Sequence, residues 1–214
     1  MISLMVRAET ENAIKRAILA GADDVMVKPV APNKMLDRVA HITIHRQPFI
    51  VTNDYLGPER RGQDSDRPSK IKQLAVVNTL KAAVEGKRMT SSEIMRAVEA
   101  NMGEVMAARL DSHGLKLGWV CAHILKAYQE KKIDKGLEER LLILVGVLED
   151  AGRTAHALGQ PDLSQICIQM ARNVEEMAEQ YENPTSLQPA TIEKLTKAFE
   201  LAKTAKAAPP AAAT

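Results

Sequence analysis

Histidine side chains in the second half of the chain are the residues most able to carry out chemistry. His123 lies in the run CAHILKAYQ, with Lys126 and Ala127 three and four positions later. On one helix, an exposed imidazole can carry a phosphoryl group while a nearby lysine offsets its charge and a small residue leaves room for a donor. A helix histidine with no catalytic role is the alternative interpretation of the same residues.

A second histidine is a weaker candidate for this chemistry. His113 in SHGLKLG has the same spacing to a leucine and a lysine, but Gly114 disfavours a position in the middle of a helix. The sequence contains no nucleophile–base arrangement, glycine-rich phosphate loop, paired carboxylates or metal-ligand spacing. We therefore predict that the chain is not an enzyme and has no metal site of its own.

Lys28 is a candidate of a different kind, because it directly follows a short apolar run. Residues 2–6 and 25–27 are predicted to be buried strands, with a helix between them that ends at Gly21 and a second helix that starts at Pro32. This order predicts parallel strands with a right-handed crossover, and it places Lys28 at the strand end where such sheets bind ligands. The second helix carries an apolar stripe formed by Met35, Leu36, Val39 and Ile42.

The remainder of the chain has a different character. Residues 47–70 combine prolines, glycines and charges with one β-prone run, FIVT, which indicates a linker or an ordered arm. A helical domain is predicted over 71–205, and a low-complexity, disordered tail over 206–214. We predict helices near 70–85, 91–111, 115–131, 135–157, 162–182 and 189–205. A capping box is predicted at Thr90–Glu93, and a core stripe formed by Met95, Val98, Met102 and Met106.

Composition and charge exclude several classes of protein. The net charge of +2 gives no sign of a basic surface for nucleic acid. A helix-turn-helix centred on Gly103 would have only Arg109 on its second helix to contact phosphate. We therefore do not expect nucleic-acid binding. Cys121 and Cys167 are predicted to be buried thiols. The longest apolar run, LLILVGVL, is too short to span a bilayer, and no signal peptide is recognised. We therefore expect a cytoplasmic protein without membrane contact.

Residues 2 to about 45 resemble the C-terminal end of a CheY-like receiver domain from bacterial two-component response regulators. The residues that carry the resemblance are the run AGADD, the apolar strand after it, Lys28-Pro29, and a leucine-containing helix that begins at Pro32. The resemblance implies the end of a doubly wound α/β fold. The expected fold class is thus an α/β fragment over residues 1–46 followed by a mostly α-helical bundle domain.

The same resemblance implies phosphorylation chemistry of which this chain holds one part. In receivers, the phosphoryl group is carried by an aspartate. An acidic pair next to it binds Mg²⁺, and a hydroxyl residue and a lysine that senses the phosphate complete the site. Lys28, with Pro29, matches the lysine, whereas the hydroxyl position falls on Val6 or Arg7. The phosphoacceptor half of a receiver is absent from these residues, so no cofactor is expected here, and we favour a protein that starts upstream of Met1.

Two further resemblances are more limited. The run RQPFIVTNDYLGPERRG is similar to the arm that follows the receiver in some response regulators; Arg60 and Arg61 either clasp an acidic or phosphate group or belong to a solvated hinge. The run around His123 is similar to the His-x-Leu-Lys core of histidine phosphotransfer domains, with alanine in place of glycine. The run TAHALGQPDLSQICIQM around His156 resembles a later segment of those domains, at the wrong distance from a histidine.

The sequence as a whole indicates a response-regulator-like protein of two-component signal transduction. We expect its helical domain to act by protein–protein contact within a phosphorelay, with a sensor histidine kinase or other phosphorelay proteins as partners. A homodimer is expected through the helix that carries Met35, Leu36 and Val39. The alternatives are a histidine phosphotransfer domain with His123 as the carrier, or a helical adaptor that is not phosphorylated.

Overall fold

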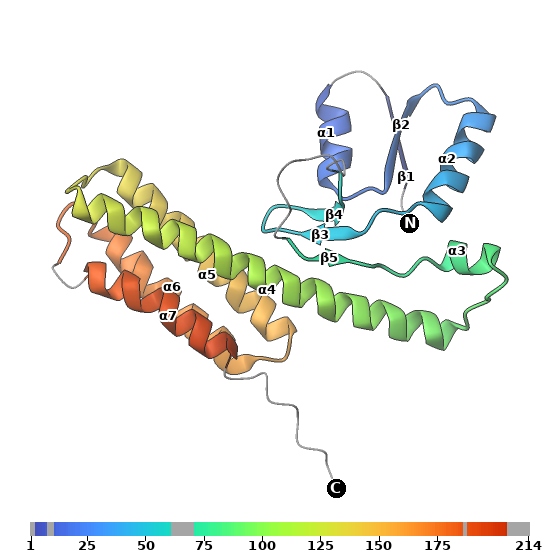
Figure 1. Cartoon of the computed structure of the whole chain (residues 1–214). Coiled ribbons are helices and arrows are strands. Elements are labelled where there is room, and N and C mark those ends of the chain that lie inside the picture. Colours follow the sequence, from blue (N-terminus) through green and yellow to red (C-terminus); the bar gives the residue numbers. More distant parts are fainter. Residues whose placement is uncertain (1–2, 8–10, 61–70, 186–187, 205–214) are drawn as a thin grey trace, which may run out of the picture. The chain divides into compact units, whose positions relative to one another are not determined.

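The computed structural model describes residues 3–7, 11–60, 71–185 and 188–204. Within this part the chain is mostly helical with two small sheets, and it divides into two compact units, Met1–Ala108 and Arg109–Thr214 (Figure 1). The boundary falls inside the helix α4, Ser91–Gln129, whereas the sequence placed the start of the helical domain near residue 71. The predicted tail over 206–214 lies outside the described residues.

The first unit begins with the predicted strand–helix–strand–helix order. Its elements are β1, Ser3–Arg7; α1, Glu11–Leu19; β2, Asp24–Lys28; and α2, Pro32–Ile44. The two strands pair in parallel, and α1 packs on both. Gly21 adopts φ 77°, the left-handed conformation that glycine favours after a helix. An α/β segment followed by a helical domain is thus confirmed.

The proline- and glycine-rich segment is an ordered arm in its described part. It contains β3, Phe49–Val51, and β4, Leu56–Pro58, joined by a short turn in which the Thr52 amide donates to the Tyr55 carbonyl at 2.8 Å. β5, Gln73–Leu74, pairs on the other side of β3, giving an antiparallel sheet of order β4-β3-β5. Only the β3 run was evident from the sequence, because β4 and β5 are too short to show a pattern.

Arg46 connects the arm to the first strand–helix segment. Its Nε and Nη2 donate to the two carboxylate oxygens of Asp23 at 2.7 and 3.3 Å, and its Nη1 donates to the Val77 carbonyl at 2.8 Å. The guanidinium also lies 5.1 Å from the ring centroid of Phe49. Because the Asp23 side chain is only 3% exposed, this bidentate pair is shielded from water and from salt.

The helix predicted over 70–85 is shorter than expected. Only α3, Thr79–Val84, is helical there, and the Asn78 side chain caps it by accepting from the Lys81 amide at 3.0 Å. The capping box at the start of α4 is confirmed, since the Thr90 amide donates to the Glu93 carboxylate at 2.7 Å and the Glu93 amide donates back to the Thr90 hydroxyl.

The predicted break between helices at 111–115 is wrong. α4 is one helix of 39 residues that passes through Gly103 and Gly114, so it also has no turn of a helix-turn-helix at Gly103. The structure explains Gly114 by packing, because a Cβ at this position would lie 3.1 Å from the ring of Phe199 on α7, Gln188–Thr204. The glycine therefore allows the two helices to approach closely.

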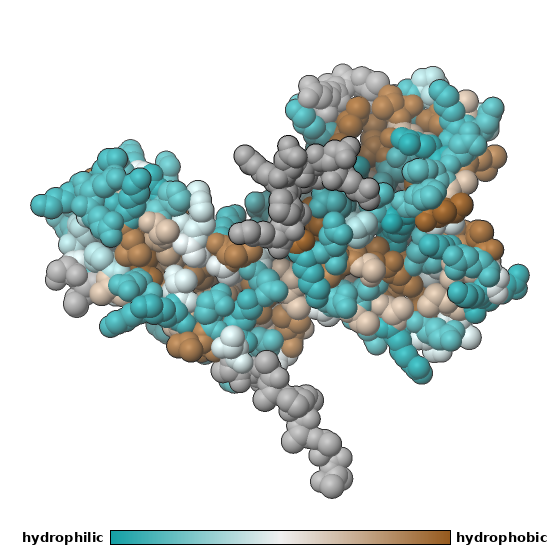
Figure 2. All heavy atoms as spheres, viewed as in Figure 1, coloured by the Kyte–Doolittle hydropathy of each residue, from teal (hydrophilic) through white to brown (hydrophobic). Residues whose placement is uncertain are grey.

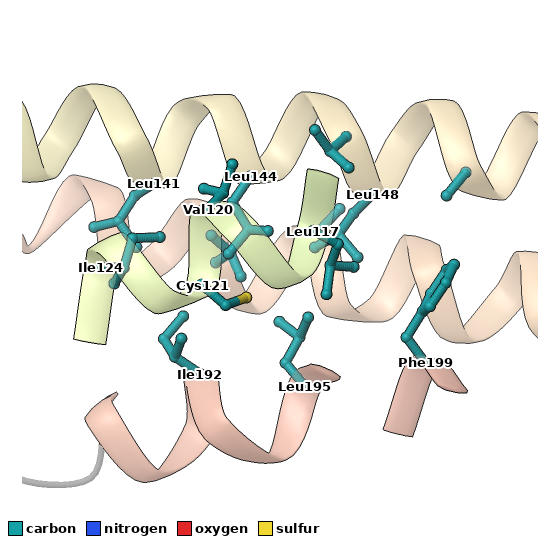
Figure 3. Packing of buried hydrophobic residues seen from close by; sticks show 14 of the residues in the cluster. Leu117, Val120, Cys121, Ile124, Leu141, Leu144, Leu148, Ile192, Leu195 and Phe199 are labelled. Carbon is teal, nitrogen blue, oxygen red and sulfur yellow. The ribbon is translucent and has the colours of Figure 1, made fainter. Parts of the chain in front are cut away.

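The second unit is a bundle formed by the C-terminal half of α4 with α5, Lys135–Ala157; α6, Pro161–Glu179; and α7. Figure 3 shows side chains from α4 pointing into a shared core with those of α5 and α7. Buried residues recur on α4 at alternating spacings of three and four, the pattern by which helices pack in bundles. They are Leu110, His113, Leu117, Val120, Ile124 and Ala127. The two cysteines lie in this core as predicted, and burial raises the pKa of Cys167 to about 11.

The methionine stripe on the N-terminal half of α4 is not in the core. Met95, Val98 and Met102 are exposed and Met106 is half-buried, so the prediction of a core stripe is wrong. The physical reason is that a neighbouring face of α4 packs on the β-sheet, where Val105 contacts a small cluster with Val51, Leu74 and Ala108.

Membrane insertion finds no support in the helices. None of the helices in the described ranges combines the length and apolar character required to cross a bilayer. Three leucines of the apolar run of α5, Leu141, Leu144 and Leu148, lie in the bundle core, whereas Leu142 is exposed.

A pair of glycine substitutions tests the close approach of the arm to the first segment. Gly21 and Gly86 both have φ 77°, but only Gly21 faces another backbone, since its Cβ would collide with the Leu56 carbonyl oxygen. We expect Gly86→Ala to cost about 1 to 2 kcal/mol from backbone strain alone, and Gly21→Ala to cost about 2 kcal/mol more from the collision.

Urea unfolding followed by circular dichroism measures both losses on the whole chain. Gly86→Ala serves as the matched control for the left-handed conformation. Equal losses in the two variants would contradict the close approach of Gly21 to Leu56.

Candidate functional site

Lys28 lies where the sequence predicted, at the C-terminal end of β2. It is exposed together with Pro29, and the peptide bond between them is cis. In the parallel register Val6 lies opposite Val27 and Arg7 opposite Lys28. Within the described strands, the backbone therefore puts a valine and an arginine, and no hydroxyl residue, beside the end of β2.

The two aspartates of the GADD turn are held in ion pairs. Asp23 is bound by Arg46, and Asp24 lies 3.4 Å from the Arg38 guanidinium on α2. Among the described residues, no group of three or more acidic, histidine or cysteine side chains is placed to hold a metal ion. Among the described residues, the geometry thus places the cation of Lys28 at a strand end, while the two aspartates of the GADD turn are engaged in ion pairs.

Arg60 has a structural contact rather than a free head group. Its Nη2 donates to the backbone carbonyl of Ala22, in the same turn that Arg46 binds through Asp23. Arg61 lies outside the described residues. The exposed Arg60 thus joins the arm to the GADD turn through Nη2, and the two interpretations of the arm stay predictions.

The apolar stripe of α2 is largely uncovered within its own unit. Leu36 is 66% exposed, Met35 is also exposed, Val39 is half-buried and only Ile42 is buried. Figure 2 shows apolar atoms at the surface where Figure 1 places β1 and β2, and the exposed residues there include Met5 and Val27. Several large exposed apolar side chains in one small unit are typical of a protein–protein contact surface.

His123 is exposed on α4 and has a defined orientation. Its Nδ1 lies 2.8 Å from the Trp119 carbonyl oxygen, and the two ring centroids are 4.0 Å apart. A carbonyl oxygen can only accept a hydrogen bond, so the proton of the neutral imidazole is on Nδ1. Nε2 therefore carries the lone pair, which is what a nucleophilic imidazole requires. Trp119 is itself exposed and forms the other half of this ring contact.

The neighbours proposed for His123 are only partly in place. Lys126 is exposed and lies 3.7 Å from Glu130, a weak surface pair that leaves its charge accessible. Ala127, however, is 4% exposed and belongs to the bundle core. The prediction of a small residue beside the imidazole at the surface is therefore wrong, since the α4 stripe of core residues includes position 127.

His113 was misjudged from the sequence. It lies in the middle of α4 and is 1% exposed, with its Nε2 at 3.4 Å from the Thr154 hydroxyl of α5. The signal that identifies it is the alternating three–four spacing of Leu110, His113 and Leu117, which places the histidine on the core face regardless of Gly114.

The segment around His156 forms the end of α5, the turn to α6 and the start of α6. His156 is exposed, Gly159 has φ 69° in the turn, and Cys167 is in the core. His156 also borders a hollow of about 580 Å³ between α5 and α6, whose lining includes Gly152, Arg153, Ser164, Ala171 and Arg172. This hollow contains neither His113 nor His123, and the structure brings no two of the three histidines together there.

The tautomer of His123 is directly measurable. We expect ¹⁵N NMR of the neutral ring to show Nδ1 protonated, because the Trp119 carbonyl accepts from it, whereas imidazoles in water favour the proton on Nε2. His156 is the control, since it has no side-chain hydrogen-bond partner among the described residues. A proton on Nε2 of His123 would contradict this geometry.

Comparison of the chain with protein-family models, curated proteins and solved structures gave no match in any of the three. The assignment of the candidate site therefore depends on the residues and contacts described above. Those contacts define two separate features, the β2–α2 surface around Lys28 and the His123 face of the bundle.

Proposed function

We propose that the chain is a response-regulator-like protein of two-component signalling whose helical bundle acts by protein–protein contact. The observations that carry this proposal are the β1-α1-β2-α2 segment, with Lys28 at the end of β2, and the exposed apolar side chains on α2. Partners from a phosphorelay, such as a sensor histidine kinase, fit this proposal.

Contact rather than catalysis is favoured by the state of the charged side chains. In the GADD turn, Asp23 and Asp24 are ion-paired and Arg60 is bound to backbone, so these groups stabilise the fold. The exposed residues of α2, by contrast, make no comparable contribution to the core of their unit. Large apolar side chains on a helix surface contribute to the free energy of association when a partner covers them and removes them from water.

Self-association through α2 follows from this proposal. We expect the double variant Met35→Ala, Leu36→Ala to shift the protein toward monomer, because it removes apolar area from the contact. The free energy of unfolding of a monomer should change by less than about 0.5 kcal/mol, since both side chains are exposed. Sedimentation velocity over a concentration series measures the shift.

Leu201→Ala is the matched control, because Leu201 is equally exposed on α7, in the other unit. It should leave the association constant unchanged. A wild-type protein that is monomeric at all concentrations, or a double variant that associates as strongly as wild type, would exclude α2 as the dimer surface.

A phosphotransfer role for His123 is the second candidate, and the hydrogen bond from Nδ1 to Trp119 is what favours it. With its proton held on Nδ1, the ring presents Nε2 to solvent for attack on phosphorus. Lys126 supplies a nearby positive charge for the phosphoryl group. The buried position of Ala127 counts against a close match to the phosphotransfer domains that the run resembles.

Incubation with a phosphorylated receiver domain tests this candidate. We expect acid-labile, alkali-stable phosphate on the chain that is lost in His123→Gln and kept in His156→Gln, whose histidine is also exposed. Phosphate retained in His123→Gln would exclude His123 as the carrier. No phosphate on the wild type would leave the helical adaptor without phosphorylation as the remaining candidate. Such an adaptor binds its partners equally whether or not the phosphorelay is active.

A further inference from the structure

His113 occupies a core position of the bundle with only one weak hydrogen bond. The Thr154 hydroxyl donates to the Asp150 carbonyl at 2.8 Å, so its oxygen can serve His113 only as an acceptor. Nε2 of His113 must then hold the proton and donate to Thr154 at 3.4 Å, a long distance for such a bond. Nδ1 carries the lone pair, is fully buried and has no hydrogen-bond partner among the described residues.

A second proton on this ring would be poorly accommodated. It would create a buried N–H donor at Nδ1 with no acceptor, together with a positive charge in an apolar core. The opened or unfolded chain can hydrate the same imidazolium at little cost. Acid therefore favours states in which the α4–α5 contact at His113 and Thr154 is broken.

The charged groups that face this position do not compensate. On α5, Asp150 favours the protonated ring, but it lies 2.6 Å from Arg153, which opposes protonation. On α4, Arg109 and Lys116 oppose it as well. On α7, a carboxylate oxygen of Glu200 lies 3.0 Å from the position that a Cβ on Gly114 would take. The Lys203 ammonium is paired with the Asp111 carboxylate at 2.5 Å. Burial is the main cause that lowers the pKa of His113 below its usual 6.5, and the three cations add to it.

We propose that His113 is an acid-sensitive latch between α4 and α5, closed while the ring is neutral and opened when it takes up a proton. The native state binds this proton less readily than the opened state, so the stabilisation is fully present above pH 6.5 and is lost as the pH falls below it. The loss continues until the native ring itself becomes protonated.

Hydrogen exchange on the whole chain tests the latch. We expect the protection factors of amides at 110–117 and 151–158 to fall between pH 7.5 and pH 5, by as much as about 30-fold if the opened ring titrates near 6.5 and the closed ring stays neutral. His113→Gln removes the titrating group but keeps a donor for Thr154, so its protection factors should not change over this range.

His156→Gln is the matched control, because it removes an exposed imidazole and should keep the wild-type fall. An equal fall in wild type and His113→Gln would overturn the proposal. If His113→Gln does not fold, ¹⁵N NMR titration of wild type decides: the latch requires His113 to remain neutral below the pH at which His156 is half-protonated, and co-titration of the two rings rules it out.

Discussion

Burial of one face of α4 is the constraint on which the second unit depends. Its core residues recur at spacings of three and four, and this period keeps Leu117 and Ile124 against the other three helices. The exposure of the side chains in this half of the helix follows from that orientation. His123 and Trp119 are exposed because they lie outside the stripe, whereas Ala127 and His113 are buried because they lie within it.

The first unit depends instead on a polar contact. The Asp23–Arg46 pair is buried and bidentate, and the same guanidinium reaches the Val77 carbonyl, so one side chain joins the GADD turn, the arm and the segment before α3. Removing either partner of a buried pair leaves an uncompensated charge, which costs about 3 to 5 kcal/mol. The GADD turn is thus one end of the contact that holds this unit together.

The sequence predicted those elements whose signal is local and periodic. The order β1-α1-β2-α2, the position of Gly21 and the capping box at Thr90 need only near neighbours in the chain, and all are confirmed. β4 and β5 have three and two residues, so their pairing depends on partners far along the chain rather than on a pattern.

The candidate site was predictable to a smaller extent, for the same reason. Lys28 and His123 are placed by their own strand and helix, and both are exposed as expected. Gly114 suggested a helix break because its own propensity is poor, yet packing against Phe199 outweighs it, and that contact is invisible in the sequence. The exposure of the methionine stripe likewise depends on which face of α4 the β-sheet covers.

The close approach of Gly21 and Gly57 has a consequence for how this protein can be recombined with others. A Cβ on Gly57 would lie 2.8 Å from the Gly21 Cα, and a Cβ on Gly21 would collide with the Leu56 carbonyl oxygen, so neither position accepts a side chain while the two segments keep their places. In a gene fusion with its junction between residues 21 and 57, the two segments would come from different proteins, and their backbones would not be complementary at this contact. The part of the chain that must be exchanged as one piece therefore extends from β1 through β4, and a junction at Arg46 would cut through it.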